Sequence, residues 1–337
     1  MSATCLIAQP IHPVGAELLR AAGITVLEPR GVDAIRAAMP EADAVIVRDG
    51  LNAELLDAAP RLAVIANHGT GTDKIDVAHA ARLGIPVTCT PGANTRAVAE
   101  HALMLMLAVS RQAVAADGAT RRGEWAFKYR QPFLSLSGRT LGVVGFGRTG
   151  RVLCEMASRG LGMRVLAWSP NADPRDLAAC GATAAASFDA LLQAADVVSL
   201  HRPLRADTRH TLDAAALRQM KPTAIVVNTS RGGLIDEAAL CAALREGRIF
   251  GAGLDVFETE PFASHAELAA LANVLLTPHV AGSSQEALHA TASQCAQQVI
   301  AALGGQMPED LVRPEVWLRR RWPVVVSPVS MSSLSHS

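Results

Sequence analysis

The chain has 337 residues, of which half are apolar and 18% are charged, with 31 basic side chains balanced by 31 acidic ones. A chain of this length is expected to form two domains, each large enough to bury its own core. The balanced charge provides no basic surface of the kind that nucleic acid or an anionic membrane requires, so neither is an expected partner.

The cysteines indicate a reducing compartment. Six of them are scattered along the chain without a C-x-x-C pair, which argues against a disulfide framework and against a zinc site. We expect no metal. The beginning of the sequence lacks the basic region of a signal peptide, and the apolar run "ALMLMLAV" is far shorter than the ~20 residues that span a bilayer. These features predict a cytoplasmic protein.

The first 95 or so residues alternate between strand-like and helix-like segments. The strand-like segments are "CLIAQ", "ITVLEP", "DAVIVR", "RLAVIANHG" and "IPVTCTPG", and helical patterns such as "VGAELLRAAG" separate them. Strands that alternate with helices of about ten residues are typical of parallel β-α-β units. We therefore predict a small, doubly wound parallel-sheet domain over residues 1–97.

A second alternating region follows a long helical stretch that begins at "NTRAVAEHAL" and is apolar enough to be buried between domains. Its six strand candidates are "TLGVVG", "MRVLAW", "DVVSLH", "AIVVNTS", "GAGLDVF" and "NVLLTPHV". They predict a larger parallel sheet over residues 98–285. The last helical pattern has no strand after it, so we expect residues 286–318 to complete the first domain. Residues 319–337 are predicted to be a poorly ordered tail.

The sequence "GFGRTG" places Gly145, Gly147 and Gly150 in the G-x-G-x-x-G spacing. It follows a strand candidate and opens a helical pattern, which is the context that the dinucleotide-binding fingerprint needs. The glycines allow a tight turn and close approach to a pyrophosphate, whose charge the helix amino end favours. This pattern predicts that the larger domain is a Rossmann dinucleotide-binding domain.

The fingerprint also predicts an acidic residue about 20 residues further on, where it binds the adenosine ribose. Ser169 stands at that position in "VLAWSPNADPRD". A serine does not repel a 2′-phosphate, and Arg175 could pair with one, whereas Asp173 and Asp176 argue for NAD. The choice between NAD and NADP stays open.

Three further strand candidates end in reactive groups: Arg231 in "NTSRGGLID", Asp255 and Glu260 in "GLDVFETEP", and His279 in "LLTPHV". Ligands gather at the carboxyl ends of strands in open α/β sheets. Beside a nicotinamide, these groups suit hydride transfer to a carbonyl or from a carbinol. Histidine can give or take the proton, a carboxylate can orient it, and an arginine can hold a substrate carboxylate by two hydrogen bonds.

Several motifs occur together and in order, and in this respect the chain resembles the D-isomer-specific 2-hydroxyacid dehydrogenases over about residues 5–318. They are "NHGTGTDKIDV", "NTRAVAEHAL", "TLGVVGFGRTG", "DVVSLHRPLRADTRH", "NTSRGGLID", "GAGLDVFETEP" and "LLTPHVAGSS". The first two are most similar to those of phosphoglycerate dehydrogenases. The resemblance implies a Rossmann domain inserted in a smaller flavodoxin-like substrate domain, and usually a homodimer.

The resemblance also assigns roles to residues. It makes His279 the acid/base, Glu260 its partner, and Arg231 the substrate-binding arginine, with the backbone at Thr70 and Gly71 receiving the substrate carboxylate. Asp255 matches the acid near the nicotinamide. The implied cofactor contacts are Gly145, Gly147, Arg148, Thr149, Gly150, Ser169, Pro203, Thr208, Thr229, Asp255 and Gly282.

Departures from the family pattern leave the substrate open among 3-phosphoglycerate, hydroxypyruvate and glyoxylate types. Asn67 and His68 stand where many phosphoglycerate-type relatives carry a basic residue. The expected cofactor is NAD or NADP, which the family and Ser169 respectively favour. Two alternatives are a dinucleotide-sensing corepressor-like binding protein, and a formate or phosphite dehydrogenase on the same fold.

Overall fold

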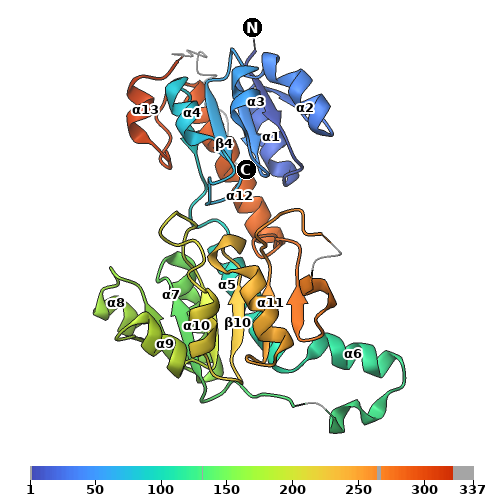
Figure 1. The fold of residues 1–337 in the computed structure, drawn as a ribbon. Coiled ribbons are helices and arrows are strands. Elements are labelled where there is room, and N and C mark those ends of the chain that lie inside the picture. Colours follow the sequence, from blue (N-terminus) through green and yellow to red (C-terminus); the bar gives the residue numbers. More distant parts are fainter. Residues whose placement is uncertain (1, 131, 264–266, 322–337) are drawn as a thin grey trace, which may run out of the picture. The chain divides into compact units, whose positions relative to one another are not determined.

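The structure is a computed structural model of the chain, and it describes residues 2–130, 132–263 and 267–321. Of the predicted tail, only residues 319–321 fall within these ranges, and the rest lies outside the described residues. The chain divides into two compact units. One unit comprises Met1–Asn94 and Ser284–Ser337, and the other comprises Thr95–Ser283. Each unit contains one parallel sheet with helices on both faces (Figure 1).

The discontinuous unit holds a five-stranded sheet in the order β2-β1-β3-β4-β5, which is the flavodoxin-like order. Its strands are β1 (Thr4–Ile7), β2 (Thr25–Leu27), β3 (Ala44–Val47), β4 (Val64–Asn67) and β5 (Val87–Thr88). Its helices are α1 (Pro13–Ala21), α2 (Val32–Ala38), η1 (Met39–Glu41), α3 (Ala53–Asp57), α4 (Val77–Arg82), α12 (Gln285–Leu303) and α13 (Pro314–Leu318).

Two hydrophobic layers cover this sheet. Helices α1 and α12 pack on one face, where Leu19, Cys295 and Val299 are buried against β1, β3 and β4. Helices α2, α3 and α4 cover the other face. The helix α12 therefore belongs to the first sheet, although residues 89–284 separate it from β5 in the sequence.

The continuous unit holds a seven-stranded sheet in the order β12-β11-β10-β9-β6-β7-β8, all parallel. Its strands are β6 (Thr140–Val144), β7 (Arg164–Trp168), β8 (Ala182–Ala184), β9 (Val197–Leu200), β10 (Ile225–Asn228), β11 (Gly251–Leu254) and β12 (Val274–Leu276). The strand order reverses between β6 and β9, so this edge is the switch point where Rossmann domains bind dinucleotides. The predicted fold class is confirmed.

The helices of this unit form two layers around the sheet, with α5 and α7 on one face and α9, α10 and α11 on the other. They are α5 (Thr95–Ser110), α6 (Ala113–Arg121), η2 (Trp125–Tyr129), α7 (Arg148–Glu155), a π-helical turn η3 (Met156–Gly160), α8 (Pro174–Ala179), α9 (Phe188–Ala194), α10 (Ala214–Gln219), η4 (Gly232–Leu234), α11 (Glu237–Arg245) and η5 (Glu267–Ala270). Side chains of Ser187, Asp213 and Asp236 cap α9, α10 and α11, which fixes where these helices begin.

Two details of the prediction for this unit are wrong. The sheet has seven strands rather than six. The strand that was not predicted is β8, a three-residue edge strand with two exposed residues and no apolar pattern in its sequence. The long helical stretch is two helices, α5 and α6, which meet at 57°. Gln112 between them adopts a left-handed backbone, with φ of 47°. The stretch is also only partly buried, since Met104 and Leu107 of α5 are exposed.

In the described part of the chain, no single helix combines the length and apolar character that a membrane crossing requires. Helices α5 and α6, which are bent relative to each other, reach that length and apolar composition only when both are taken together.

Candidate active site

The turn that joins β6 to α7 leaves no room for side chains at two glycines. Gly145 has φ of +103°, and a Cβ there would lie 2.6 Å from the carbonyl oxygen of His201. A Cβ on Gly150 would lie 2.4 Å from the carbonyl oxygen of Gly145. The turn is therefore as tight as the dinucleotide fingerprint requires.

The amino end of α7 is open to an anion. Gly147 precedes the helix without a capping side chain, and the first turn holds no acidic residue. A Cβ on Gly147 would meet no atom within 4 Å, and Arg148 is exposed. Backbone N–H groups and the helix dipole attract negative charge at such a position. Gly147, Arg148 and Thr149 thus fit the pyrophosphate of a dinucleotide.

Ser169 lies beside this turn, at the end of β7. The N–H of Gly145 donates to the carbonyl oxygen of Trp168 at 2.9 Å, which joins the two strand ends. The guanidinium of Arg202 stacks on the Trp168 ring at 5.1 Å. A cation therefore lies next to the position where the ribose of a dinucleotide is expected.

The two acidic residues that follow Ser169 are already engaged. Asp173 caps α8, and its Oδ1 accepts from the backbone N of Arg175 at 2.8 Å. Asp176 forms an ion pair with Arg151 at 2.6 Å. Asp176 is thus neutralised, and Asp173 is committed to its own helix.

The remaining predicted cofactor contacts lie at the same edge of the sheet. Thr208 is buried and donates to the carbonyl oxygen of Pro203 at 2.7 Å, so it shapes the loop after β9. Thr229 follows β10, and its Oγ1 is buried without a hydrogen-bond partner among the described residues. An orphaned hydroxyl at this edge suits contact with a bound ligand. Gly282 is half-buried in the loop after β12.

His201 adds a neutral group beneath the glycine turn. Burial lowers the pKa of its imidazole to about 4, so the ring carries no charge at neutral pH. Its Nε2 lies 2.8 Å from Oγ of Ser199. The positive charge at this edge therefore comes from arginines and from the amino end of α7.

His279 and Glu260 form the central pair of the site. Nδ1 of His279 lies 2.9 Å from Oε2 of Glu260. The His279 side chain is 42% exposed, whereas that of Glu260 is 18% exposed. One ring nitrogen is thus held by a carboxylate while much of the ring still faces open space. Such a pair fixes the ring orientation.

Asp255 holds the loop that carries His279. Its carboxylate is fully buried and accepts from the backbone N–H groups of Val280 and Ala281 at 2.9 and 2.8 Å. It also accepts from Oγ1 of Thr277 at 2.6 Å. His279 itself has φ of 54°, and its N–H donates to the carbonyl oxygen of Asp255. This network fixes the unusual backbone of His279.

One residue of this network was missed in the sequence. Nε2 of His101, on α5, lies 2.9 Å from Oγ1 of Thr277 and 3.5 Å from Oδ1 of Asp255. His101 occurs in the segment "NTRAVAEHAL", but 154 positions separate it from Asp255. No local spacing could reveal that contact.

Arg231 lies at the end of β10, next to β11 in the sheet. Its Nη1 donates to the carbonyl oxygen of Ser230 at 2.8 Å, and its own carbonyl accepts from Nδ2 of Asn228. A Cβ on the next residue, Gly232, would lie 1.8 Å from the carbonyl carbon of Phe257. The backbone beside Arg231 is therefore pressed against the segment that carries Glu260.

Thr70 and Gly71 lie in the other unit, in the loop after β4. Nδ2 of Asn67 donates to the carbonyl oxygens of Gly69 and Gly71 at 2.8 and 3.0 Å. The N–H of Thr90 donates to the carbonyl oxygen of Gly69. The side chain of Asn67 thus holds the loop in place.

His68 is the neighbour of Asn67 and is mostly buried. Its Nε2 has no hydrogen-bond partner among the described residues. Burial, and secondarily the charge of Arg48, lower the pKa of this imidazole to about 4. His68 is therefore neutral at neutral pH and supplies no cation to the loop.

Comparisons with known proteins agree with this geometry. The model of the D-isomer specific 2-hydroxyacid dehydrogenase, NAD binding domain, matches residues 103–281. The glyoxylate reductase of Thermococcus litoralis is 42% identical over 294 residues, covering 86% of this chain and 88% of that protein. The D-3-phosphoglycerate dehydrogenase of Mycobacterium tuberculosis is 41% identical over 83% of this chain, which spans 53% of that longer enzyme.

Among solved structures, an NADPH-dependent glyoxylate/hydroxypyruvate reductase from Sinorhizobium meliloti, in complex with NADP and malonate, superimposes with a TM-score of 0.81. It is 31% identical, and the match covers 93% of this chain and 98% of that one. Fold, site and relatives together define an oxidoreductase that acts on CH–OH groups with NAD or NADP. The chain belongs to the D-isomer specific 2-hydroxyacid dehydrogenase family. The predicted family, enzyme class and cofactor class are confirmed.

Proposed function

We propose that this chain reduces a small, unphosphorylated 2-oxo acid, of the glyoxylate or hydroxypyruvate type, to the corresponding 2-hydroxy acid, which is the D-isomer where the product is chiral. The observation that carries the proposal is the bond of 2.9 Å between His279 Nδ1 and Glu260 Oε2 beside a dinucleotide turn. The relatives named glyoxylate reductase, from several archaea, support the substrate class.

His279 acts as the acid in reduction. With Nδ1 bound to Glu260, its Nε2 gives a proton to the carbonyl oxygen of the substrate, and in oxidation Nε2 takes the hydroxyl proton. Glu260 holds Nδ1 and so fixes the orientation of the ring during the transfer. General acid catalysis of this kind contributes about 10²–10⁴-fold to the rate.

Arg231 and the loop at Thr70 and Gly71 orient the substrate carboxylate. A guanidinium can bind a carboxylate through two parallel hydrogen bonds, and it polarises a neighbouring carbonyl. Backbone N–H groups of the loop are suited to the same anion. A substrate bound through its carboxylate keeps its carbonyl oxygen free for His279.

The dinucleotide, when bound, supplies the hydride in reduction or accepts it in oxidation. We propose that Gly145, Gly147, Arg148, Thr149 and Gly150 receive its pyrophosphate. We further assign contacts with the remaining parts of the cofactor to Ser169, Pro203, Thr208, Thr229, Asp255 and Gly282. The tight turn and the open amino end of α7 support these assignments.

We infer that NADPH is accepted at least as well as NADH. Ser169 brings no charge that would repel a 2′-phosphate, and Asp176 is neutralised by Arg151. Arg202, stacked on Trp168 at 5.1 Å, supplies a cation at this corner. An arginine near the ribose is the usual device for accommodating the additional phosphate.

The environment of the 67–71 loop supports an unphosphorylated substrate. Asn67 is engaged in holding the loop, and His68 is neutral, so neither offers a charge to a phosphate. Arg48 is close enough to His68 to affect its pKa. Because Arg48 could supply a charge to a phosphate, a phosphorylated 2-oxo acid is the substrate to compare with the unphosphorylated ones.

The test is a reductase assay that follows NADPH and NADH absorbance with glyoxylate, hydroxypyruvate and 3-phosphohydroxypyruvate. We expect kcat/KM for the best unphosphorylated acid to exceed that for the phosphorylated one by about tenfold or more, or ~1.4 kcal/mol, because neither Asn67 nor His68 offers a phosphate an ion pair. The reverse order would remove the substrate assignment and keep the enzyme class. No turnover with any of the three acids would contradict the proposed function itself.

We also propose that the discontinuous unit is the substrate-binding domain and that the enzyme works in the cytoplasm. The matched NAD-binding model lies wholly within Thr95–Ser283, which leaves the 67–71 loop in the other unit. Five of the cysteines are buried free thiols, namely Cys5, Cys154, Cys180, Cys241 and Cys295. Free buried thiols suit a reducing compartment.

The remaining proposal is a homodimer built on one surface of the continuous unit. This arm surface consists of Met104, Leu107, Val114, Trp125, Tyr129 and Phe133, all exposed apolar side chains on or near α5, α6 and η2. Trp125 and Tyr129 are 71% and 80% exposed, with Lys128 between their rings. Exposed apolar side chains gathered on neighbouring elements indicate a protein contact.

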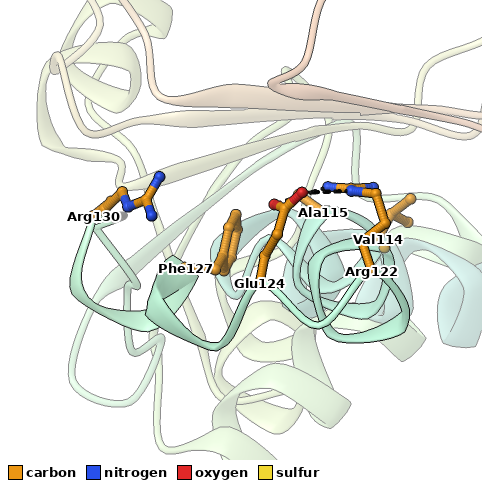
Figure 2. A pocket seen from close by; sticks show the side chains of 7 residues that line it. Val114, Ala115, Arg122, Glu124, Phe127 and Arg130 are labelled. Carbon is orange, nitrogen blue, oxygen red and sulfur yellow. Dashed lines mark hydrogen bonds and ion pairs between the residues drawn. The ribbon is translucent and has the colours of Figure 1, made fainter.

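A hollow in the arm surface favours a second copy as the partner. The hollow has a volume of about 340 Å³ and shares Val114 with the arm surface. Figure 2 shows side chains that line it, including Phe127, Arg130 and the ion pair of Arg122 with Glu124. Apolar knobs and a hollow on one surface allow self-complementary packing about a twofold axis. Charges of both signs line the hollow, so a copy of the same surface can satisfy them.

Replacing Trp125 and Tyr129 together by serine is expected to convert the dimer to a monomer, because both are large aromatic anchors of the proposed contact. Light scattering after size exclusion should show the chain mass instead of twice that mass. As a matched control, Leu318→Ser changes an 87% exposed side chain on α13 and should leave the dimer intact. A monomeric parent chain, or a dimeric double variant, would refute this assembly.

A further inference from the structure

The segment of residues 257–260, which ends at Glu260, is held from several sides. The backbone N of Phe257 donates to Oε1 of Glu260 at 3.2 Å, so the carboxylate is tied to its own segment. The N–H of Glu258 donates to Oε1 of Glu237, the first residue of α11. Gly232 packs directly against the backbone of Phe257 and Glu258.

His210 makes a further contact with this segment. Nε2 of His210 lies 2.5 Å from Oε1 of Glu258, and Nη2 of Arg209 lies 3.3 Å from the same oxygen. His210 comes from the loop between β9 and α10, where its N–H donates to the carbonyl oxygen of Gly233. The contact therefore joins the loop after β9 to the segment after β11.

The backbone of His210 is strained to make this contact. Its φ is 51°, in the left-handed region that non-glycine residues rarely adopt. Gln112, His210 and His279 are the non-glycine residues with positive φ among those described. Two of them are histidines bound to carboxylates of the 257–260 segment, one at Glu258 and the other at Glu260. Such outliers cluster where surrounding structure is used to place a functional group.

Charge gives a second reason for the contact. Glu237, Glu258 and Glu260 lie near one another, and the pKa of Glu237 is raised by burial and further by the charges of Glu258 and Glu260. Like charges at close range destabilise one another. The cationic side chain of Arg209 offsets the charge of Glu258, and His210 binds the same carboxylate oxygen, so three carboxylates are compatible in one place.

We propose that His210 is a positioning residue for the proton transfer: by binding Glu258 it fixes the 257–260 segment so that Glu260 meets Nδ1 of His279. This inference rests on the proposed role of His279 and Glu260. The path of contacts runs from His210 to Glu258, along two residues of main chain to Glu260, and from Glu260 to His279. His210 touches neither substrate nor cofactor in this scheme.

His210→Asn is the test variant, because asparagine tolerates the left-handed backbone but is too short to reach Glu258. We expect kcat to fall about tenfold, while KM and the Kd for NADPH stay within about twofold, as for loss of an interaction used in the transition state. His210→Gln, whose amide can donate to Glu258, should recover much of the loss. A matched control is His79→Asn, which removes a histidine bound to Asp57 at 2.6 Å in the other unit.

Coupling to Glu260 separates positioning from general stability. In a Glu260→Gln background, His210→Asn should lower kcat by no more than about 1.5-fold, since the two residues act on the same step. An equal tenfold loss in both backgrounds would overturn the proposal. Unchanged kcat in the single variant would overturn it as well.

A spectroscopic measurement tests the inference without relying on turnover. The Nδ1 proton of His279, identified by its loss in His279→Asn, should give a downfield NMR resonance because it is bound to a carboxylate. We expect His210→Asn to move that resonance upfield or broaden it, and His79→Asn to leave it unchanged. An unmoved resonance in His210→Asn would overturn the positioning role, even if the chain reduced none of the acids tested.

Discussion

Replacing His279 by alanine is expected to lower kcat by about three orders of magnitude while leaving NADPH binding nearly unchanged. The ring is the group placed to give a proton to the substrate oxygen, with Nδ1 held 2.9 Å from Glu260 and the side chain 42% exposed. The pyrophosphate turn depends on glycines after β6 and not on His279. Stopped-flow turnover and NADPH titration by fluorescence measure the two quantities separately.

The control for this variant is His79→Ala, which removes another histidine bound to a carboxylate, here Asp57. It should retain the parent kcat. A His279→Ala chain with kcat within about tenfold of the parent would exclude His279 as the acid/base, because a general acid contributes more than that. A large loss of NADPH affinity would instead point to a damaged loop, since Asp255 holds the backbone of Val280 and Ala281 directly after His279.

The layout of both sheets could be predicted because parallel strands are buried on both faces. Strands such as "AVIV" at β3 and "IVVN" at β10 are continuous apolar runs, and helices of similar length separate them. The pattern failed at β8, where Ala182–Ala184 carries small residues at the sheet edge. It also failed at Gln112, where the chain turns without a glycine or proline to mark the break.

In the candidate site too, some residues could be predicted from local sequence patterns and others could not. His279, Glu260 and Arg231 follow strand-like segments, so the rule that ligands gather at strand ends located them from sequence. His101 and His210 were not singled out, because each acts through a contact with a residue far along the chain. His101 reaches Thr277 from α5, and His210 reaches Glu258 from the loop after β9. Such partners become visible only when the strands are brought into register.

The turn after β10 fixes the backbone of Arg231, so we expect substrate binding to be sensitive to substitutions of this side chain. Asn228 accepts from Ser230 and donates to the carbonyl oxygen of Arg231, which closes the turn after β10. Gly232 then passes so close to Phe257 that no side chain fits. The turn thus fixes the backbone of Arg231 relative to the segment that carries Glu260. The guanidinium extends from a backbone that is held in place.

Arg231→Gln is expected to lower kcat/KM for the best 2-oxo acid by about three orders of magnitude, or ~4 kcal/mol, because an amide replaces two charge-assisted hydrogen bonds to the substrate carboxylate. Arg231→Lys should lose less, about 10²-fold, since it keeps the charge and loses the paired geometry. Steady-state kinetics with saturating NADPH give both values. Arg245→Gln, which breaks the surface ion pair with Glu267 at 2.6 Å, is the matched control and should leave kcat/KM unchanged. If lysine and glutamine at position 231 gave equal losses, the charge of Arg231 would play no part in binding, and its role would be confined to the turn after β10.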